Sequence, residues 1–456
     1  YKWIIMLLYN INRKIVKTVI IPLADLLMHT SLKKFYNQIK DMNCWSKSEI
    51  AEWQNKKLTQ LIEYAYRNTD YYKNLFDENN IVPSDIKNIN DLKYIPILTK
   101  DTLRDKFPEF ISKQINNFPY KKGHTGGSTG NPSPYYQSYD SWSFINANTW
   151  YNWEKMGYRY SDPFLALGSS SLYVEHKSSL KHIIYYRLKG KIAVNGINMS
   201  DETCASYVDL IKKKHIHFLY GYASSLYLLA KYVIKNNINL KIKCCFPTSE
   251  VLTDNYRKTI QEAFNCNIMD CYGANDGGIC AFSNVPGFYE VGYNSIVRLK
   301  EKGDNNLGEA LLTDLFNIAT PLINYQVGDN IIIDDNINKS YQYNGQIINS
   351  VLGRTSDIIT LGNGRVLTGP GFTILFKDIP VEYYCIEKIS DYELVCWLIK
   401  LNNYNSFYDD LILSTLNKQT GPGIKITIKE TKSPYLAKSG KRKYFIDSIL
   451  QSNSTQ

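Results

Sequence analysis

The sequence of 456 residues lacks an apolar run long enough to cross a bilayer. Its N-terminal apolar run, Trp3 to Tyr9, has seven residues, whereas a spanning helix needs about 20. The nine cysteines are scattered, without a C-x-x-C pair and without cysteine and histidine spacings that suit zinc. The sequence therefore argues against a membrane-spanning protein, a disulfide scaffold and a zinc module. It favours reduced thiols and a cytoplasmic location.

Tight clusters of basic residues are also missing, although the chain is basic overall. Lys and Arg number 53 against 43 Asp and Glu, which gives a formal net charge of +10. Because these residues are spread along the chain, nucleic acid is not an expected partner. The charge favours phosphorylated or carboxylated ligands. A hydrophobic content of 44% and the length of the chain indicate a folded protein of two or three domains.

Residues 1–28 carry two apolar stretches, Trp3 to Tyr9 and Ile15 to Leu27, which are separated by polar and basic residues such as Arg13 and Lys14. Two interpretations stay open for this segment. It lies on a membrane surface as a cationic amphipathic segment, which predicts peripheral contact at the inner face of the membrane. Alternatively, it packs as a helix on the body of the protein.

Short apolar runs alternate with helical patterns between Phe164 and Pro247. This alternation predicts an α/β architecture with a largely parallel sheet, in which ligands bind at loops that leave the carboxyl ends of strands. Two predicted strands end in polar loops of this kind. Cys244–Pro247 leads to Thr248, Ser249 and Glu250, and Ile268–Cys271 leads to Tyr272, Gly273 and Asp276.

The regions before and after residue 125 are predicted to be rich in helices and aromatic residues. Ser46 and Glu49 form a capping box that opens a helix, which we expect to end at Asp70–Tyr72. An extended piece, Ile95–Lys100, leads into another helix. Tyr135–Trp153 is predicted to be helical as well.

A glycine-rich loop runs from Gly123 to Pro132. Its backbone N–H groups can form a nest for an anion, and its two hydroxyls can donate to phosphate oxygens. It is not a Walker A loop, because it ends in Gly130-Asn131-Pro132. A phosphate cradle and a flexible surface turn are the two interpretations. The candidate phosphate ligands are Thr125, Gly126, Gly127, Ser128, Thr129 and Gly130.

Charged side chains mark further candidate positions in the last third of the chain. Asp329 is expected at a turn after an apolar strand, where it would bind ribose hydroxyls or cap the turn. Gly353-Arg354 separates a smaller C-terminal α/β segment. Lys441 follows Gly440 and can reach an anionic group as a mobile charge, with a solvated basic tail as the alternative.

Taken in order, these pieces resemble the adenylate-forming ligases, specifically the phenylacetate–CoA ligase branch and its capsular-polysaccharide relatives. The resemblance covers nearly the whole chain. It rests on Asp70–Tyr72, Ile95–Lys100, Thr125–Pro132, Gly221–Ser224, Ser249–Leu252, Tyr272-Gly273 with Asp276, Thr313–Leu315, Pro321–Tyr325, Gly328-Asp329, Gly353-Arg354 and Gly440-Lys441. It implies a large domain with mixed sheets over residues 1–352 and a small mobile α/β domain over residues 353–456.

The resemblance also implies an ATP- and Mg²⁺-dependent, two-step reaction. A carboxylic acid becomes an acyl-adenylate with release of pyrophosphate, and an acceptor then displaces AMP. The implied roles are phosphate binding by Thr125–Gly130, adenine binding by Tyr272 and Gly273 with Ser249, Glu250 and Val251 as the wall, ribose binding by Asp329 and Arg354, and catalysis by Lys441.

Several positions depart from the family pattern. Asp276 stands where the family usually has Glu as a metal ligand, so metal contact through it is expected to be longer or water-mediated. Asn324 replaces an arginine and removes one charge near the ribose. The hinge carboxylate is replaced by Ser356, with Asp357 one place later. No Cys/His set follows the Tyr-Gly turn, so zinc is not expected.

Three functions stay open at this point. The acyl acceptor is an amine in surface-polysaccharide assembly, or it is CoA as in acyl- or aryl-CoA ligases. The third possibility is a non-catalytic nucleotide-binding protein, against which the presence of Lys441 argues.

Overall fold

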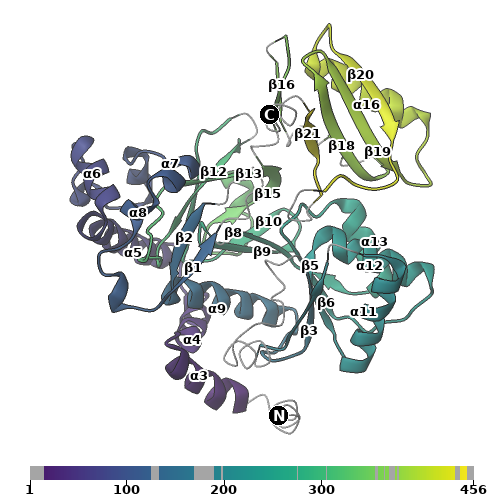
Figure 1. The fold of residues 1–456 in the computed structure, drawn as a ribbon. Coiled ribbons are helices and arrows are strands. Elements are labelled where there is room, and N and C mark those ends of the chain that lie inside the picture. The colour runs from purple at the N-terminus through teal and green to yellow at the C-terminus, as the bar shows by residue number, and fades with distance from the viewer. Residues whose placement is uncertain are drawn as a thin grey trace.

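The computed structural model describes residues 15–124, 133–168, 189–196, 199–274, 276–303, 306–354, 358–363, 365–368, 375–376, 379–436 and 442–448. These residues form a mixed α/β protein with several sheets (Figure 1), as the sequence predicted. Within them, no helix combines the length and the apolar character that crossing a membrane requires.

The largest sheet has nine strands, in the order β14-β10-β9-β8-β6-β5-β3-β4, with β7 beside β6. Its strands from β3 to β8 pair in parallel, which confirms the predicted parallel sheet for this half. The other half is antiparallel, because β8 and β9 are joined by a tight turn. The bounds are β3 (Phe164–Gly168), β4 (Lys191–Asn195), β5 (Phe218–Tyr222), β6 (Cys244–Thr248), β7 (Asn267–Ile268), β8 (Asp270–Ala274), β9 (Ile279–Val285), β10 (Phe288–Val291) and β14 (Ile347–Ile348).

Helices cover both faces of this sheet, because successive side chains of a buried strand point to opposite sides. Leu165 and Leu167 of β3 pack in one apolar cluster with α11 (Asp201–Lys214), α12 (Ala223–Lys235) and α13 (Asp254–Phe264). Phe164 and Ala166 face the other way, toward α9 (Tyr139–Lys155). On that face Trp153 of α9 stacks on Phe246 of β6 with ring centroids 4.0 Å apart.

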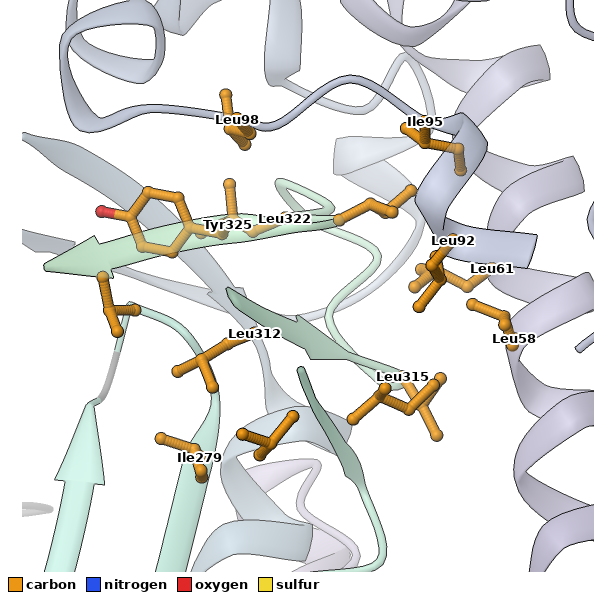
Figure 2. Close-up of a cluster of buried hydrophobic side chains, with 14 of the residues drawn as sticks. Leu58, Leu61, Leu92, Ile95, Leu98, Ile279, Leu312, Leu315, Leu322 and Tyr325 are labelled. Carbon is orange, nitrogen blue, oxygen red and sulfur yellow. The ribbon is translucent and has the colours of Figure 1, made fainter. Parts of the chain in front are cut away.

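A second, antiparallel sheet packs against the N-terminal helices. Its order is β11-β12-β13-β15. Figure 2 shows the shared core, in which Leu58 and Leu61 of a helix pack with Leu312 of the sheet and with Leu315 directly after it. The bounds are β11 (Ser295–Leu299), β12 (Leu307–Asp314), β13 (Tyr325–Ile332) and β15 (Ser350–Arg354), with α14 (Asp335–Asn338) between the last two.

The N-terminal helices are delimited by side-chain caps. Ser46 and Glu49 form the predicted capping box of α5. The prediction that Asp70–Tyr72 ends this helix is wrong: α5 stops at Asn68, and Thr69 caps a new helix that begins at Asp70. The bounds are η1 (Val16–Ile20), α3 (Ile21–Met28), α4 (Leu32–Met42), α5 (Lys47–Asn68), α6 (Asp70–Glu78), η2 (Pro83–Asp85), η3 (Ile89–Tyr94), α7 (Lys100–Asp105), α8 (Phe107–Phe110) and η4 (Ile115–Asn117).

A β-hairpin flanks the glycine-rich loop. β1 (Tyr120–His124) pairs antiparallel with β2 (Pro134–Ser138), and α9 starts only at Tyr139. The predicted helix over Tyr135–Trp153 is therefore wrong in its first part. Burial alternates from residue to residue in this segment, because Tyr135 and Gln137 are buried whereas Tyr136 is partly exposed. Such alternation is typical of a strand and not of a helix.

The C-terminal strands form sheets of their own, with a separate apolar cluster around α16. Figure 1 shows this unit beside α12 and α13. The predicted domain boundary after residue 352 falls within β15, whose Gly353 and Arg354 still pair with β13. The bounds are β16 (Ile358–Thr360), β17 (Val366–Thr368), β18 (Val381–Ser390), β19 (Glu393–Lys400), α16 (Ser406–Thr420), β20 (Lys425–Glu430) and β21 (Phe445–Asp447).

Candidate active site

Two neighbouring parallel strands, β6 and β8, bring the predicted adenine-binding segments to one edge of the large sheet. Ser249 and Glu250 follow β6 as expected, whereas the expectation that Tyr272 and Gly273 lie in a loop after a strand is wrong, because both lie inside β8. Thr248, the last residue of β6, pairs with Cys271 of β8. Ser249 follows directly and is exposed, with a φ of 66°. A left-handed backbone at a serine is strained, and such outliers concentrate at functional sites.

The structure brings together three residues that the sequence analysis assigned to the nucleoside. The Tyr272 hydroxyl donates a 2.8 Å hydrogen bond to Asp329 Oδ2. Asp329 in turn pairs with Arg354 across β13 and β15. An aromatic ring, a carboxylate and the backbone of an arginine thus converge from positions as far as 82 residues apart in the sequence, from 272 to 354.

Asp329 was expected at a turn, and this expectation is wrong. It lies inside β13, which pairs with β12 on one side and β15 on the other. The extended piece Ile95–Lys100 supports the same strand: Gln326 N–H donates to the Leu98 carbonyl at 2.9 Å, and Lys100 Nζ donates to the Val327 carbonyl. The strand holds the Asp329 carboxylate in a fixed position opposite Tyr272.

Glu250 acts partly as a structural group. Its Oε2 accepts a 2.8 Å hydrogen bond from Ser224 N–H in the first turn of α12, where a carboxylate complements the helix dipole. Its Oε1 is buried and has no hydrogen-bond partner among the described residues. This oxygen is a candidate acceptor for a ligand donor at the edge of the sheet.

Asp276 lies in the turn between β8 and β9. Its Oδ2 accepts a 3.0 Å hydrogen bond from the Tyr325 hydroxyl, and the Tyr325 ring packs in the core with the hydroxyl pointing away from it (Figure 2). In the described part of the chain, no three His, Cys, Asp or Glu side chains gather as metal ligands. A single carboxylate still fits Mg²⁺, which is usually bound by one or two carboxylates together with substrate phosphates and water.

Asn324, expected near the ribose, is a buried structural residue instead. Its amide donates to the Ile95 carbonyl at 2.9 Å and accepts from Arg298 Nη1 at 3.0 Å. It also adopts a left-handed backbone, with a φ of 51°, which asparagine tolerates better than arginine. The asparagine therefore fixes the start of β13, and a nearby arginine supplies positive charge.

Several predicted site residues lie outside the described residues. These are Thr125, Gly126, Gly127, Ser128, Thr129, Gly130, Ser356, Asp357 and Lys441. The chain on either side of the glycine loop is described, and His124 pairs with Pro134 at the end of the hairpin. Arg442 is buried, bonds the Tyr256 hydroxyl of α13, and lies 3.7 Å from Glu382. The interpretation of this segment as a solvated basic tail is therefore wrong at Arg442.

A cavity of about 450 Å³ opens beside Tyr272 and Gly273 of β8, between α9 and the sheet. Three lysines line it together with an apolar wall: Lys121, Lys189, Lys191, Trp153, Phe164, Tyr220 and Phe282. No sequence pattern identified these three lysines as residues of one site. The Lys-Gly-Lys spacing at 189–191 was the one available signal.

The cavity lowers the pKa values of these lysines. Desolvation lowers the pKa of Lys121 and of Lys191 to about 8. Desolvation, with repulsion from Lys191 and Lys121, lowers the pKa of Lys189 to about 7. Burial lowers the pKa of an amine because it disfavours the charged form. A bound anion raises the pKa again, because an opposite charge nearby stabilises the protonated amine.

Two buried carboxyls support the site from within the protein. Asp270 accepts a 2.5 Å hydrogen bond from the Tyr289 hydroxyl, and Asp314 accepts one of 2.5 Å from the Ser141 hydroxyl. Burial raises the pKa of each to about 6. These hydrogen bonds fix β8 to β10 and β12 to α9 around the cavity.

Comparisons with known proteins identify relatives of this chain by sequence and by fold. No family model matches the chain. Protein CapK of Staphylococcus aureus is 25% identical over 350 residues, which are 76% of this chain and 77% of CapK. Indoleacetate–lysine synthetase of Pseudomonas savastanoi is 24% identical over 54% of this chain and 62% of its own length. Phenylacetate-coenzyme A ligase of Pseudomonas putida is 23% identical over 63% of this chain and 67% of its own length.

The fold is shared with a solved structure of 2-hydroxyisobutyryl-CoA ligase in the postadenylation state, with a TM-score of 0.65 and 16% identity over 90% of this chain and 92% of that one. Fold and sequence relatives together place the chain in the adenylate-forming ligase superfamily, the class of AMP-forming acid ligases. Within it, the chain is similar in sequence to CapK and to phenylacetate-coenzyme A ligase.

Proposed function

We propose that this protein activates a carboxylic acid with ATP as an acyl-adenylate and transfers the acyl group to an amine acceptor in surface-polysaccharide biosynthesis. The observation that carries the proposal is the pair of Tyr272 and Asp329, joined at 2.8 Å beside the polar ends of β6 and β8. An aromatic face and a carboxylate held together match the two parts of adenosine, the base and the ribose hydroxyls.

In this proposal Tyr272 stacks on adenine, and Gly273 lets the backbone approach the base. Ser249, Glu250 and Val251 form the opposite wall. The free Glu250 Oε1 suits the exocyclic amino group of adenine as a hydrogen-bond donor. Asp329 and Arg354 bind the ribose.

The reacting groups meet where the two predicted domains, 1–352 and 353–456, face each other. Thr125–Gly130 would cradle the outgoing phosphates, and Lys441 would bridge the carboxylate and the α-phosphate. Asp276 would hold Mg²⁺, which lowers the repulsion between the two anions when bound. Ser356 and Asp357 would serve as the hinge.

The name of one relative supports an amine acceptor, because indoleacetate–lysine synthetase is named for joining an acid to an amino acid. The role in surface-polysaccharide assembly follows from the resemblance to the capsular-polysaccharide relatives of the phenylacetate–CoA ligase branch. CoA remains the alternative acceptor, because phenylacetate-coenzyme A ligase and 2-hydroxyisobutyryl-CoA ligase are named for it.

Pyrophosphate release from ATP tests the proposal. We expect release that depends on one class of acid in a panel of aryl, fatty, amino and uronic acids. Product analysis with CoA and with amino sugars, amino acids and amino polyols then separates the two acceptors. A thioester formed with free CoA, and no amide, would contradict the amine acceptor. Pyrophosphate release that is the same with and without each acid of the panel would contradict acid activation.

We also propose peripheral contact with the inner face of the membrane through residues 1–28, in a cytoplasmic protein. Five apolar side chains in η1 and α3 are exposed at helical spacing, from 47% at Ile15 to 72% at Leu26. The group comprises Ile15, Val19, Leu23, Leu26 and Leu27. The opposite side is packed, since Val16 and Ile21 are buried and Asp25 accepts from the Leu32 N–H of α4 at 3.0 Å. A one-sided apolar face next to basic residues suits an anionic lipid surface.

Exchange of three exposed leucines tests this contact without removing the cap at Asp25. We expect Leu23→Ser, Leu26→Ser and Leu27→Ser together to abolish flotation with vesicles of anionic phospholipid, because they remove most of the apolar face. The matched control is Ile337→Ser with Phe407→Ser, two exposed apolar residues elsewhere. Flotation that is equal in all three proteins, or absent from the wild type, would contradict the contact.

A further inference from the structure

Three lysines from two separate parts of the chain converge on the cavity beside the candidate adenylation site. Lys121 lies on β1, whereas Lys191 begins β4, the edge strand of the large sheet, and Lys189 lies two residues before it. Lys189 Nζ donates to Asn146 Oδ1 of α9 at 2.7 Å, and Lys121 Nζ lies 5.9 Å from the ring centroid of Trp142 on the same helix face. No carboxylate is among the described residues that line this cavity.

The lysines at β4 lie far from the carboxyl group that would be activated. That carboxyl group must lie near Tyr272-Gly273 on β8, where the nucleotide binds in the proposed function. Four inter-strand steps separate β8 from β4 in the sheet, and at about 4.8 Å each they amount to roughly 19 Å between the backbones. The long lysine side chains shorten this gap but do not close it.

The floor between the two ends is apolar and aromatic. Phe164 and Tyr220 come from the sheet, and Trp153 comes from α9. Such a wall binds a hydrocarbon or aromatic stem and offers little to a short acid. The cavity thus has a reactive end, an apolar middle and a cationic far end.

We propose that the acid activated by this protein is an extended dianion, whose second anionic group is bound by Lys121, Lys189 and Lys191. The inference rests on the proposed function and adds the substrate class to it. A carboxylate, sulfonate or phosphate would serve, because each accepts charge-assisted hydrogen bonds from ammonium groups. Half-buried lysines that repel one another gain most from such an anion, since it keeps them protonated inside the cavity.

Matched pairs of acids that differ only in the charge at the far end test this. Adipate, suberate, sebacate and 4-carboxycinnamate are compared with their monomethyl esters in the pyrophosphate-release assay. We expect the diacid of the best pair to have a kcat/KM about tenfold or more above its ester, the effect of one hydrogen bond to a charged group. Lys189→Met with Lys191→Met should remove this preference and leave the ester unchanged.

Lys122→Met is the matched control. Lys122 neighbours Lys121 on β1 but is exposed and is not among the residues that line the cavity. It should keep the preference for the diacid. Esters that match or exceed their diacids in the wild type would overturn the inference. The inference would also be overturned if Lys189→Met with Lys191→Met raised the KM for ATP by the same factor with every acid. The lysines would then bind the phosphates of the nucleotide.

A second measurement separates failure of this inference from failure of the proposed function. Acetylation of Lys189 and Lys191 by acetic anhydride, relative to Lys122, is followed by mass spectrometry without ATP. Sebacate or another diacid should slow the labelling several-fold, and its monomethyl ester should not. Protection without any pyrophosphate release would support the anion site and contradict the ligase proposal. No protection by any diacid would overturn the anion site.

Discussion

Lys441→Ala should lower the rate of acid-dependent pyrophosphate release by about 10²–10³-fold and leave ATP binding nearly unchanged. The ammonium would neutralise the meeting of a carboxylate and a phosphate, so its contribution is concentrated in the adenylation transition state. In the proposed function, ATP affinity depends mainly on Tyr272 and Asp329, which belong to β8 and β13. Single-turnover pyrophosphate release and equilibrium ATP binding measure the two effects separately.

The neighbouring Lys443→Ala is the control for loss of charge in the same segment. It should retain pyrophosphate release, since the Lys443 carbonyl, not its side chain, is the group that accepts from the Tyr383 hydroxyl. When acyl-adenylate is supplied ready-made, Lys441→Ala should still transfer the acyl group. Release at the wild-type rate by Lys441→Ala would remove this lysine from the mechanism. It would also favour the alternative of a non-catalytic nucleotide-binding protein.

Asp329→Ala should weaken ATP binding by about 10²-fold, since two hydrogen bonds from ribose hydroxyls to a charged acceptor are lost at about 1.5 kcal/mol each. Tyr272→Phe should have a much smaller effect, because it removes the 2.8 Å bond to Asp329 and keeps the ring. Tyr272→Ala removes the ring as well and should approach the effect of Asp329→Ala. Titration calorimetry with ATP compares the three variants.

Binding of 2′,3′-dideoxy-ATP, which lacks both ribose hydroxyls, tests whether Asp329 binds those hydroxyls directly. This analogue should bind weakly to the wild type and lose no further affinity in Asp329→Ala, because the hydroxyls and their partner form one interaction. An equal loss for ATP and the analogue would mean that Asp329 acts only through the structure of β13.

Local sequence patterns predicted those features that depend on neighbours along the chain. The capping box at Ser46, the strands β3, β5 and β6, and the helix after Thr99 follow from short-range spacing and from side-chain oxygens at helix starts. Local patterns failed where pairing with a distant strand determines the secondary structure. Asp329 reads as a turn residue after a glycine, yet β13 continues through it and its backbone pairs with Arg354 of β15.

The sequence predicted which residues are candidates for binding the nucleoside. It did not predict which of them contact one another. A polar residue after a buried strand marks the edge of a parallel sheet, which is why Ser249 was identified. Tyr272 was identified on the same ground, although β8 extends through it. That Asp329 meets Tyr272, and that Asn324 is buried beside Arg298, depends on how two different sheets pack together. No periodicity along one segment carries this information.

By itself, the sequence determined the elements and their order, because propensity, capping and alternation act over a few residues. It also supplied the family pattern from Asp70 to Lys441. Only the tertiary structure decided that Lys121, Lys189 and Lys191 share one cavity, since β4 joins the sheet beside β3 while β1 reaches the same side of α9. The lowered pKa values of these lysines have the same origin, because burial and mutual repulsion arise only when distant segments are packed together.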